Sequence, residues 1–350
     1  MNAEAHQGFD RQHSEAASLL QRFGQETRVY LQHYLTPDSE APYLDALLAE
    51  YPKRGGKMLR PGICIANALI FGGELKQAAR SAAAVELLHN ALLIHDDVQD
   101  ESEFRRGLPT LHAQHGVSLA INAGDALLFT AFQPLLDAIR PLGAEVGQRV
   151  LDVTIAMARQ TAEGQALELG WRDGNVLDLT EADYLRMALK KTAWMGMIWP
   201  AQLGVLMGAR GRIDPARVVR FGHFLGLAFQ IEDDLRNLTD NPGYGKERNG
   251  DLYEGKRTLM LIHVHGACSA EEKARLEHLL GLPRAERPAE EIDWLAALME
   301  ERGSIRHARQ VADAMAGVAM MEFRTAYDGL PPSAELDFLE ILPSWVFDRP

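Results

Sequence analysis

Three aspartates follow an apolar segment at a spacing that suits metal binding. Asp96 and Asp100 are four residues apart and share one face of a helix, with Asp97 beside them. Carboxylates this close repel one another unless a cation lies between them. Their oxygens suit Mg²⁺, which keeps several waters and also binds the phosphates of a substrate. The spacing therefore predicts a site for Mg²⁺ and a phosphorylated ligand.

Two arginines come directly after these aspartates. Arg105 and Arg106 can each bind phosphate oxygens through a pair of N–H groups. The alternative is ion pairing with Glu101 and Glu103 at the surface, which would contribute little to stability. Metal ligands and phosphate ligands in one short segment favour diphosphate chemistry.

A second acidic cluster repeats the first spacing. Asp233, Asp234 and Asn237 follow an apolar helical run over residues 221–231. Acids are disfavoured at the carboxyl end of a helix by its macrodipole, so a solvated cluster is the weaker alternative. Asn237 offers a carbonyl oxygen but no charge, and we expect it to hold an ion less strongly. The two acidic helix ends are expected to face each other across a cavity.

Residues 53–60 form a basic loop in an acidic protein. Gly55 and Gly56 permit unusual backbone angles and close approach to a ligand. A diphosphate clamp and a solvated basic loop are both compatible with this stretch alone. The four basic residues of the loop are Lys53, Arg54, Lys57 and Arg60.

Together these segments resemble the trans-type prenyl diphosphate synthase family. DDVQD followed by RRG, over residues 96–107, resembles the first aspartate-rich motif of that family. DDLRN resembles the second, with Asn237 where an Asp is usual, and GGKMLRP resembles the motif GGKRxRP, with Met58 in place of an Arg. The resemblance covers roughly residues 51–261 in the order of the family. It implies an all-α isoprenoid synthase fold and the head-to-tail condensation of an allylic diphosphate with isopentenyl diphosphate.

The resemblance also assigns roles to single residues. It implies three Mg²⁺ ions, held by Asp96, Asp97, Asp100, Asp233, Asp234 and Asn237. It assigns the allylic diphosphate to Arg105, Lys191, Thr192, Gln230, Lys246 and Lys256. It assigns isopentenyl diphosphate to Lys57, Arg60, His89 and Arg106. The residues expected to be catalytic are Asp96, Asp97, Asp100, Arg105, Lys191, Asp233 and Asp234. Without the resemblance, His89 would be a typical core histidine, because a lone His in an apolar helix is usually structural.

The length of the product is expected to depend on the helix that carries Asp96. An isoprene unit is about as long as one helical turn, ~5 Å, so Leu88, Ala91 and Leu92 would form the floor of the chain pocket. Family members that stop at fifteen carbons tend to have an aromatic residue at the fourth or fifth position before the motif. Leu92 and Ala91 stand there, and geranylgeranyl diphosphate is therefore the predicted product, with farnesyl and longer polyprenyl diphosphates as alternatives.

Two other functions are compatible with the same fold. A terpene cyclase would need one acidic motif and no second diphosphate site, and the basic loop and the paired arginines argue against it. A non-catalytic partner subunit should lack one or both metal motifs. Here both motifs are present, apart from Asn237.

Composition limits the partners and the cellular location. The net charge of −13 argues against binding to nucleic acid and to anionic membranes. Two cysteines, no hydrophobic signal-peptide core and no uninterrupted run of about 18 apolar residues predict a cytoplasmic protein with no transmembrane segment. Family members are commonly homodimers, and we expect the same here.

Apolar periodicity predicts an all-α domain over residues 1–350, with residues 1–13 flexible and about a dozen helices around a central cavity. No alternating strand pattern is present. The expected helices span residues 14–34, 45–51, 61–71, 75–100, 119–136, 146–169, 181–206, 218–238, 257–268, 270–280, 289–301 and 304–327.

Overall fold

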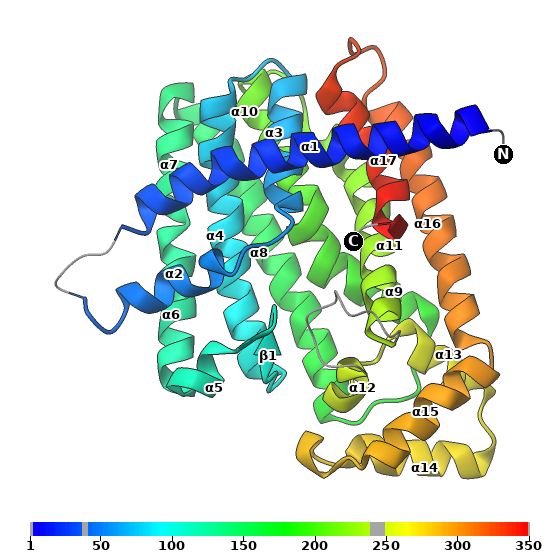
Figure 1. The fold of residues 1–350 in the computed structure, drawn as a ribbon. Helices are drawn as coiled ribbons and strands as arrows, with labels where there is room; N and C mark the ends of the chain where they lie inside the picture. The colour runs from blue at the N-terminus through cyan, green and yellow to red at the C-terminus, as the bar shows by residue number, and fades with distance from the viewer. Residues whose placement is uncertain (1–2, 37–40, 239–248, 349–350) are drawn as a thin grey trace.

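Helices account for nearly all of the regular structure in the computed structural model, which describes residues 3–36, 41–238 and 249–348. The all-α prediction is confirmed (Figure 1). The helices of the first half are α1 (Ala3–Tyr34), α2 (Asp45–Lys53), α3 (Leu59–Ile70), α4 (Leu75–Gln99), α5 (Leu111–His115), α6 (Val117–Thr130), α7 (Phe132–Ile139) and α8 (Ala144–Asp173). Those of the second half are α9 (Glu181–Ala188), the π-helix η2 (Leu189–Ile198), α10 (Trp199–Ala209), α11 (Val219–Leu238), α12 (Gly250–Glu254), α13 (Leu259–Ala267), α14 (Ala270–Gly281), α15 (Ala289–Glu301), α16 (Ser304–Ala326) and α17 (Ala334–Asp348).

Short elements join these helices. The 3₁₀ turns are η1 (Arg140–Leu142), η3 (Pro215–Val218) and η4 (Arg284–Glu286). Strands β1 (Phe104–Arg105) and β2 (Leu108–Pro109) pair antiparallel, with Arg105 opposite Leu108. This small hairpin was not predicted, because two-residue strands are too short to produce an alternating pattern.

Several helix boundaries differ from the prediction. The stretch expected as one helix over residues 181–206 consists of α9, the π-helix η2 and α10, which ends at Ala209. Helix α1 begins earlier, at Ala3, and the C-terminal tail forms α17. The helix expected over residues 119–136 is divided into α6 and α7. Pro134 lies just after the division, and it has no N–H to donate to the carbonyl four residues before it.

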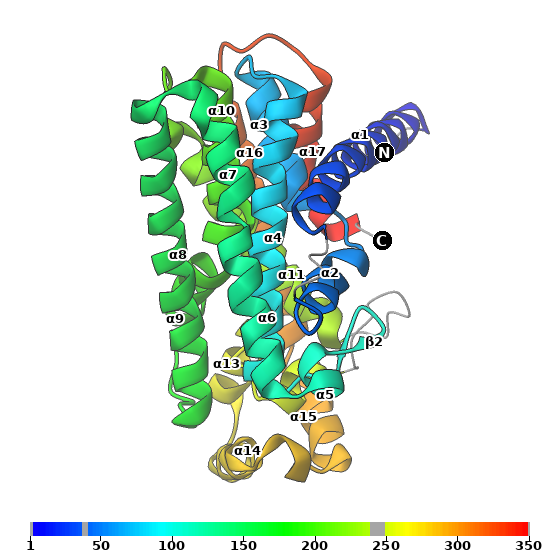
Figure 2. The ribbon, with the colours of Figure 1, turned by 90° about the vertical axis from the view of Figure 1, so that its left-hand side faces the viewer.

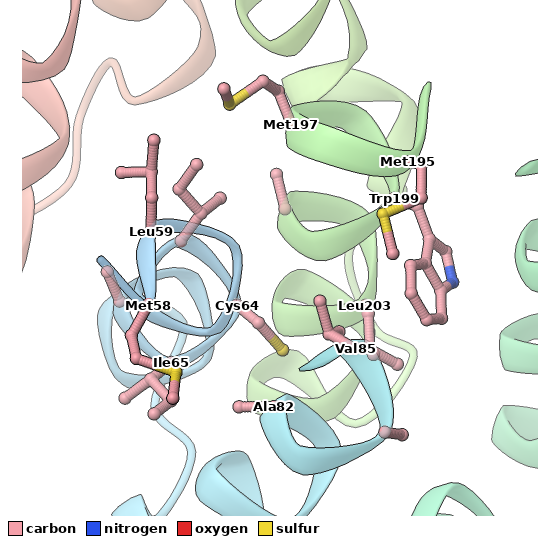
Figure 3. Close-up of a cluster of buried hydrophobic side chains, with 14 of the residues drawn as sticks. Met58, Leu59, Cys64, Ile65, Ala82, Val85, Met195, Met197, Trp199 and Leu203 are labelled. Carbon is pink, nitrogen blue, oxygen red and sulfur yellow. The ribbon is translucent and has the colours of Figure 1, made fainter. Parts of the chain in front are cut away.

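Helix α4 lies in the middle of the bundle (Figure 2) and packs against α1, α3, α6 and α7. Its buried residues occur on nearly all sides, as expected for a helix enclosed by others. Figure 3 shows part of the surrounding core, where Cys64 of α3 and Val85 of α4 lie near Trp199 and Leu203 of α10. The packing fixes α4 so that its acidic carboxyl end has one orientation.

A second hydrophobic cluster lies among α9, α11 and helices α13 to α16. Figure 1 shows α14 and α15 at the lower end of the molecule, beyond α9 and α12. Helix α11 contributes side chains to both clusters, and α16 packs along it. The prediction of a single domain stays a prediction.

Among the residues that the structure describes, one helical stretch, residues 117–142, is long and apolar enough to cross a membrane by length and composition, with a mean hydropathy of 1.3 in its most apolar window. No membrane-spanning stretch was predicted from the sequence, because only an uninterrupted run of about 18 apolar residues was counted as one. The share of the window buried inside the protein is 39%. Helices with these properties also occur in protein cores and at interfaces between subunits, so the stretch alone is weak evidence for a membrane span.

Candidate active site

The carboxyl end of α4 brings Asp96 and Asp100 together with several cations. Lys191 Nζ lies 3.3 Å from Asp96 Oδ1, and Gln165 Nε2 donates to the same oxygen at 3.2 Å. Lys256 Nζ lies 3.2 Å from Asp100 Oδ2. These contacts join α4 to α8, to the π-helix η2 and to the segment after α12. Residues far apart in the sequence therefore converge on the first acidic motif.

Asp97 points in a different direction from its two neighbours. Arg105 Nε donates to Asp97 Oδ1 at 2.9 Å, and Tyr51 Oη donates to Asp97 Oδ2 at 2.5 Å. The Asp97 side chain is 1% exposed. Both oxygens of Asp97 are therefore bound inside the protein, and its role as a metal ligand stays a prediction. We assign it the role of positioning Arg105.

The π-helix η2 places Lys191 beside the first motif and Thr192 beside the second. Such helices are rare and commonly occur at functional sites. A Cβ atom on Gly164 of α8 would lie 2.2 Å from Lys191 N, and one on Gly226 of α11 would lie 2.3 Å from the Ala193 Cβ. Only glycine permits this close packing, so the two neighbouring helices hold the π-helix by their backbones.

The second acidic motif is largely buried at the end of α11. Tyr184 Oη donates to Asp234 Oδ2 at 2.7 Å, and Gln230 Nε2 donates to Asp234 Oδ1 at 2.6 Å. Thr192 Oγ1 donates to Gln230 Oε1 at 2.5 Å. Asp233 is the half-buried carboxylate of this motif. Thr192 and Gln230 are therefore in contact, and the π-helix connects the two motifs, the first through Lys191 and the second through Thr192.

Asn237 does not face this region with its oxygen. Its Oδ1 accepts a hydrogen bond from the backbone N–H of Asp251 at 2.9 Å, and the side chain is buried. This hydrogen bond holds the first turn of α12 against the end of α11, and the role of Asn237 as a metal ligand stays a prediction. Lys256 Nζ lies 3.4 Å from Asp251 Oδ1, which links this turn to Asp100. Lys246 lies outside the described residues.

The basic loop and Arg106 lie together, as predicted. A Cβ on Gly56 would come within 2.9 Å of the Arg106 guanidinium, so the absence of a side chain there makes room for Arg106. Lys57 is exposed, with Nζ 5.9 Å from the centre of the Trp345 ring. Burial and the charge of Arg60 lower the pKa of His89 well below its usual value, so this imidazole is neutral at pH 7.

Burial favours the neutral form of the ionisable groups in the site. It raises the pKa of Asp100 to about 6, against the opposing effect of Lys256. It also raises the pKa of Asp234 to about 8, with repulsion from Asp251 adding to the shift. Burial alone would lower the pKa of Lys191, but the charges of nearby carboxylates outweigh it and raise the pKa. For both aspartates the net effect of the site disfavours the charged form, and at Asp100 the charge of Lys256 offsets only part of the cost of burial.

The carboxylates of the first motif suit a Mg²⁺ ion that is bound only in part by the protein. Within residues 3–36, 41–238 and 249–348, no three His, Cys, Asp or Glu side chains converge as a complete metal site. Asp96 and Asp100 nevertheless present hard oxygens on one face of α4. Mg²⁺ is usually bound by one or two carboxylates together with waters and substrate phosphates. The arrangement fits an ion that arrives with a diphosphate.

The predicted chain-length residues lie in the wall of the main core. Leu88 is 7% exposed and Ala91 is 0% exposed. Leu92 is half-buried and packs against the same cluster. Because successive residues turn by about 100° around a helix, Leu92 lies near the Asp96 side of α4 and Ala91 lies well away from it. Leu92 is therefore the better placed of the two to meet a substrate chain.

Four residues of the site were missed in the sequence: Tyr51, Arg172, Tyr184 and Arg284. Arg172 could have been found, because Gln165, Glu168 and Arg172 form a polar stripe at helical spacing on α8. The other three carry no pattern of their own. Arg284 lies 3.3 Å from Glu254 through Nη1 and Oε1, a contact across 30 residues that only the fold creates.

The family model and the most similar relatives indicate the same protein family. A model of the polyprenyl synthetase family matches residues 41–299. The chain is 36% identical over 259 residues to the short chain isoprenyl diphosphate synthase of Methanothermobacter thermautotrophicus, covering 74% of this chain and 77% of the relative. It is 38% identical over 228 residues to the geranylgeranyl diphosphate synthase of Sulfolobus acidocaldarius, covering 65% and 68%.

Solved structures agree in fold over almost the whole chain. The geranylgeranyl pyrophosphate synthetase of Pyrococcus horikoshii superposes with a TM-score of 0.82 at 29% identity, covering 95% of this chain and 99% of that one. The polyprenyl synthase of Caulobacter crescentus, complexed with calcium and isoprenyl diphosphate, gives a TM-score of 0.83 at 26% identity, covering 96% and 97%. The isoprenoid synthase fold expected from the sequence is confirmed.

Proposed function

The chain belongs to the polyprenyl synthetase family, and from this premise we propose that it condenses an allylic diphosphate with isopentenyl diphosphate, mainly to geranylgeranyl diphosphate. It is an enzyme, a prenyltransferase. The observation that carries the proposal is the convergence of Lys191 and Lys256 on Asp96 and Asp100. Cations and metal-binding carboxylates at one place suit a diphosphate leaving group.

Mg²⁺, held by Asp96, Asp100 and Asp233, would supply Lewis-acid stabilisation of the leaving diphosphate. The other groups come from this chain. Lys191 and Arg105 place fixed positive charges where negative charge develops as the allylic C–O bond breaks. Asp97 and Tyr51 hold Arg105 in place for this role. Fixed charges in a water-poor site need no reorganisation during the reaction.

The second substrate is assigned to the surface formed by the basic loop and Arg106. Lys57, Arg60 and Arg106 would bind the diphosphate of isopentenyl diphosphate. The neutral His89 would serve as a hydrogen-bond partner without adding charge. The double bond of this substrate then attacks the allylic carbon, and a proton is lost to the departing diphosphate. No side-chain nucleophile is required.

A direct assay tests this function. The full-length protein is incubated with Mg²⁺, isopentenyl diphosphate and dimethylallyl, geranyl or farnesyl diphosphate, and products are identified by mass spectrometry. We expect a twenty-carbon diphosphate as the main product. Release of a cyclic hydrocarbon from an allylic diphosphate alone would identify a terpene cyclase, and no turnover with any primer would indicate a non-catalytic subunit.

The two diphosphate sites are expected to respond to different substitutions. Lys57→Ala and Arg60→Ala should raise the KM for isopentenyl diphosphate by roughly tenfold or more, because each removes a charge-assisted contact. Lys191→Ala should chiefly affect the allylic substrate. Steady-state kinetics with each substrate varied in turn measure the difference. Equal effects of all three substitutions on both substrates would contradict the assignment.

Product length should respond to a bulky residue on α4. Leu92→Phe places a ring one turn before Asp96, and we expect it to shift the main product to fifteen carbons. Ala91→Phe changes another predicted chain-length residue, but it inserts a ring at a fully enclosed position and should cost about 1–3 kcal/mol of stability. Product analysis and thermal unfolding of both variants measure these effects. An unchanged product from Leu92→Phe would contradict this account of the pocket.

We further propose a cytoplasmic homodimer that pairs through α6 and α7. Helix α6 buries only a narrow stripe of its surface in the chain itself, and Phe129 is 70% exposed. The other exposed large apolar residues of these helices are Val117, Leu119, Ile121 and Leu136. Phe129→Asp should yield a monomer in analytical ultracentrifugation. A wild-type protein that is monomeric at micromolar concentration would contradict the proposal.

A further inference from the structure

Arg172 is a cation that the proposed reaction does not use, although it contacts a proposed metal ligand. Its Nη1 donates to Asp100 Oδ1 at 2.9 Å, and its Nη2 donates to the backbone oxygen of Gln99 at 2.7 Å. The Arg172 side chain is 20% exposed and that of Asp100 is 2% exposed. The guanidinium is therefore the accessible member of the pair.

Asp100 has a cation on each of its oxygens. Arg172 binds Oδ1, and Lys256 Nζ lies 3.2 Å from Oδ2. A divalent ion bound to this carboxylate would lie close to both positive charges, and like charges repel strongly in a buried site. The ion and Arg172 thus compete for the same oxygen. A guanidinium displaced from Asp100 keeps its fork of N–H donors, which matches the oxygens of a phosphate.

We propose that Arg172 is an exchangeable counter-ion: a divalent ion takes Asp100, and the released guanidinium binds the allylic diphosphate. The inference rests on the proposed function of the site. Its consequence is a positive coupling between the two ligands. The metal ion frees the guanidinium for the diphosphate, and the diphosphate in turn removes the competitor of the metal ion. By thermodynamic linkage each ligand then raises the affinity of the other by the same factor.

A purely structural role for Arg172 makes a different prediction. Its contact with the Gln99 carbonyl caps the carboxyl end of α4, where a cation is favourable. Arg284 lies in a similar position, with Nη1 3.4 Å from the backbone oxygen of Asp100. A cap contributes to stability, but its loss would leave the coupling between metal ion and diphosphate unchanged.

Calorimetric titration of the full-length protein separates the two roles without measuring turnover. Mg²⁺ and inorganic pyrophosphate are titrated singly and each in the presence of the other, with a protein-free titration to subtract their complex in solution. In Arg172→Gln we expect Mg²⁺ alone to bind severalfold more tightly, because a competing charge is gone. Pyrophosphate in the presence of Mg²⁺ should bind roughly tenfold more weakly, because a charge-assisted contact is lost.

Two variants serve as controls. Arg159→Gln removes an exposed arginine of the same helix that pairs with Glu163, and it should leave both affinities unchanged. Arg172→Lys keeps the charge without the fork and should retain part of the coupling. Unchanged coupling with lower thermal stability in Arg172→Gln would overturn the exchange and leave a helix cap. Weaker binding of Mg²⁺ alone would also overturn it. A wild-type protein that binds neither ligand would overturn the proposed function itself.

Discussion

Replacement of Asp96 by alanine is expected to lower turnover by roughly three orders of magnitude, because stabilisation of the leaving group by a metal ion contributes several kcal/mol. The fold should survive the change. Lys191, which lies 3.3 Å from Asp96, keeps its ion pair with Glu168 in the variant. Removal of one of several repelling carboxylates also relieves repulsion. Steady-state assays with saturating Mg²⁺ and thermal unfolding measure the two effects separately.

Asp125→Ala is the matched control for this substitution. Asp125 is an exposed aspartate on α6 whose Oδ1 lies 3.2 Å from His95 Nε2. Its loss should change neither turnover nor unfolding temperature appreciably. Near-normal turnover in Asp96→Ala with Mg²⁺ would contradict the metal assignment. A large drop in the unfolding temperature would show that the loss of activity reflects the fold rather than the chemistry.

Asp97→Ala, unlike Asp96→Ala, should cause a large loss of stability. The substitution leaves the buried guanidinium of Arg105 without its carboxylate, and removal of one partner of a buried ion pair typically costs about 3–5 kcal/mol. Tyr51 loses its acceptor at the same time. Urea unfolding followed by circular dichroism measures the free energy. Activity falls as well, because Arg105 is no longer held in position.

A double-mutant cycle tests the pairing itself. Arg105→Met alone leaves Asp97 as an uncompensated buried charge, whereas Arg105→Met combined with Asp97→Ala removes both charges. The double variant should therefore unfold with less loss of free energy than the two single losses added together. If Asp97→Ala stayed within about 1 kcal/mol of the wild type yet lost activity as fully as Asp96→Ala, the result would contradict the positioning role and support the predicted role of Asp97 as a metal ligand.

Local patterns in the sequence were sufficient to predict most of the helices and the chemistry of the motifs that they carry. Apolar spacing located α4 to within a residue at each end and matched α15 over Ala289–Glu301. The acidic motifs and the basic loop could be identified from the sequence because the residues of each one lie within a few positions of one another. Helix boundaries were less certain where packing decides them. The π-helix depends on Gly164 and Gly226, which approach it from other helices and leave no mark in its own sequence.

The direction in which each polar side chain points depends on the tertiary packing and could not be predicted from local patterns. Asp96 and Asp97 are chemically alike and adjacent, yet one meets Lys191 and the other meets Arg105 and Tyr51. The spacing of Asn237 predicts a metal ligand, whereas in the structure its oxygen accepts a hydrogen bond from the backbone N–H of Asp251. A helix turns by about 100° per residue, so neighbouring residues face different partners, and those partners come from distant segments. Spacing along the chain gives the face of a helix, but the packing of other helices determines what that face meets.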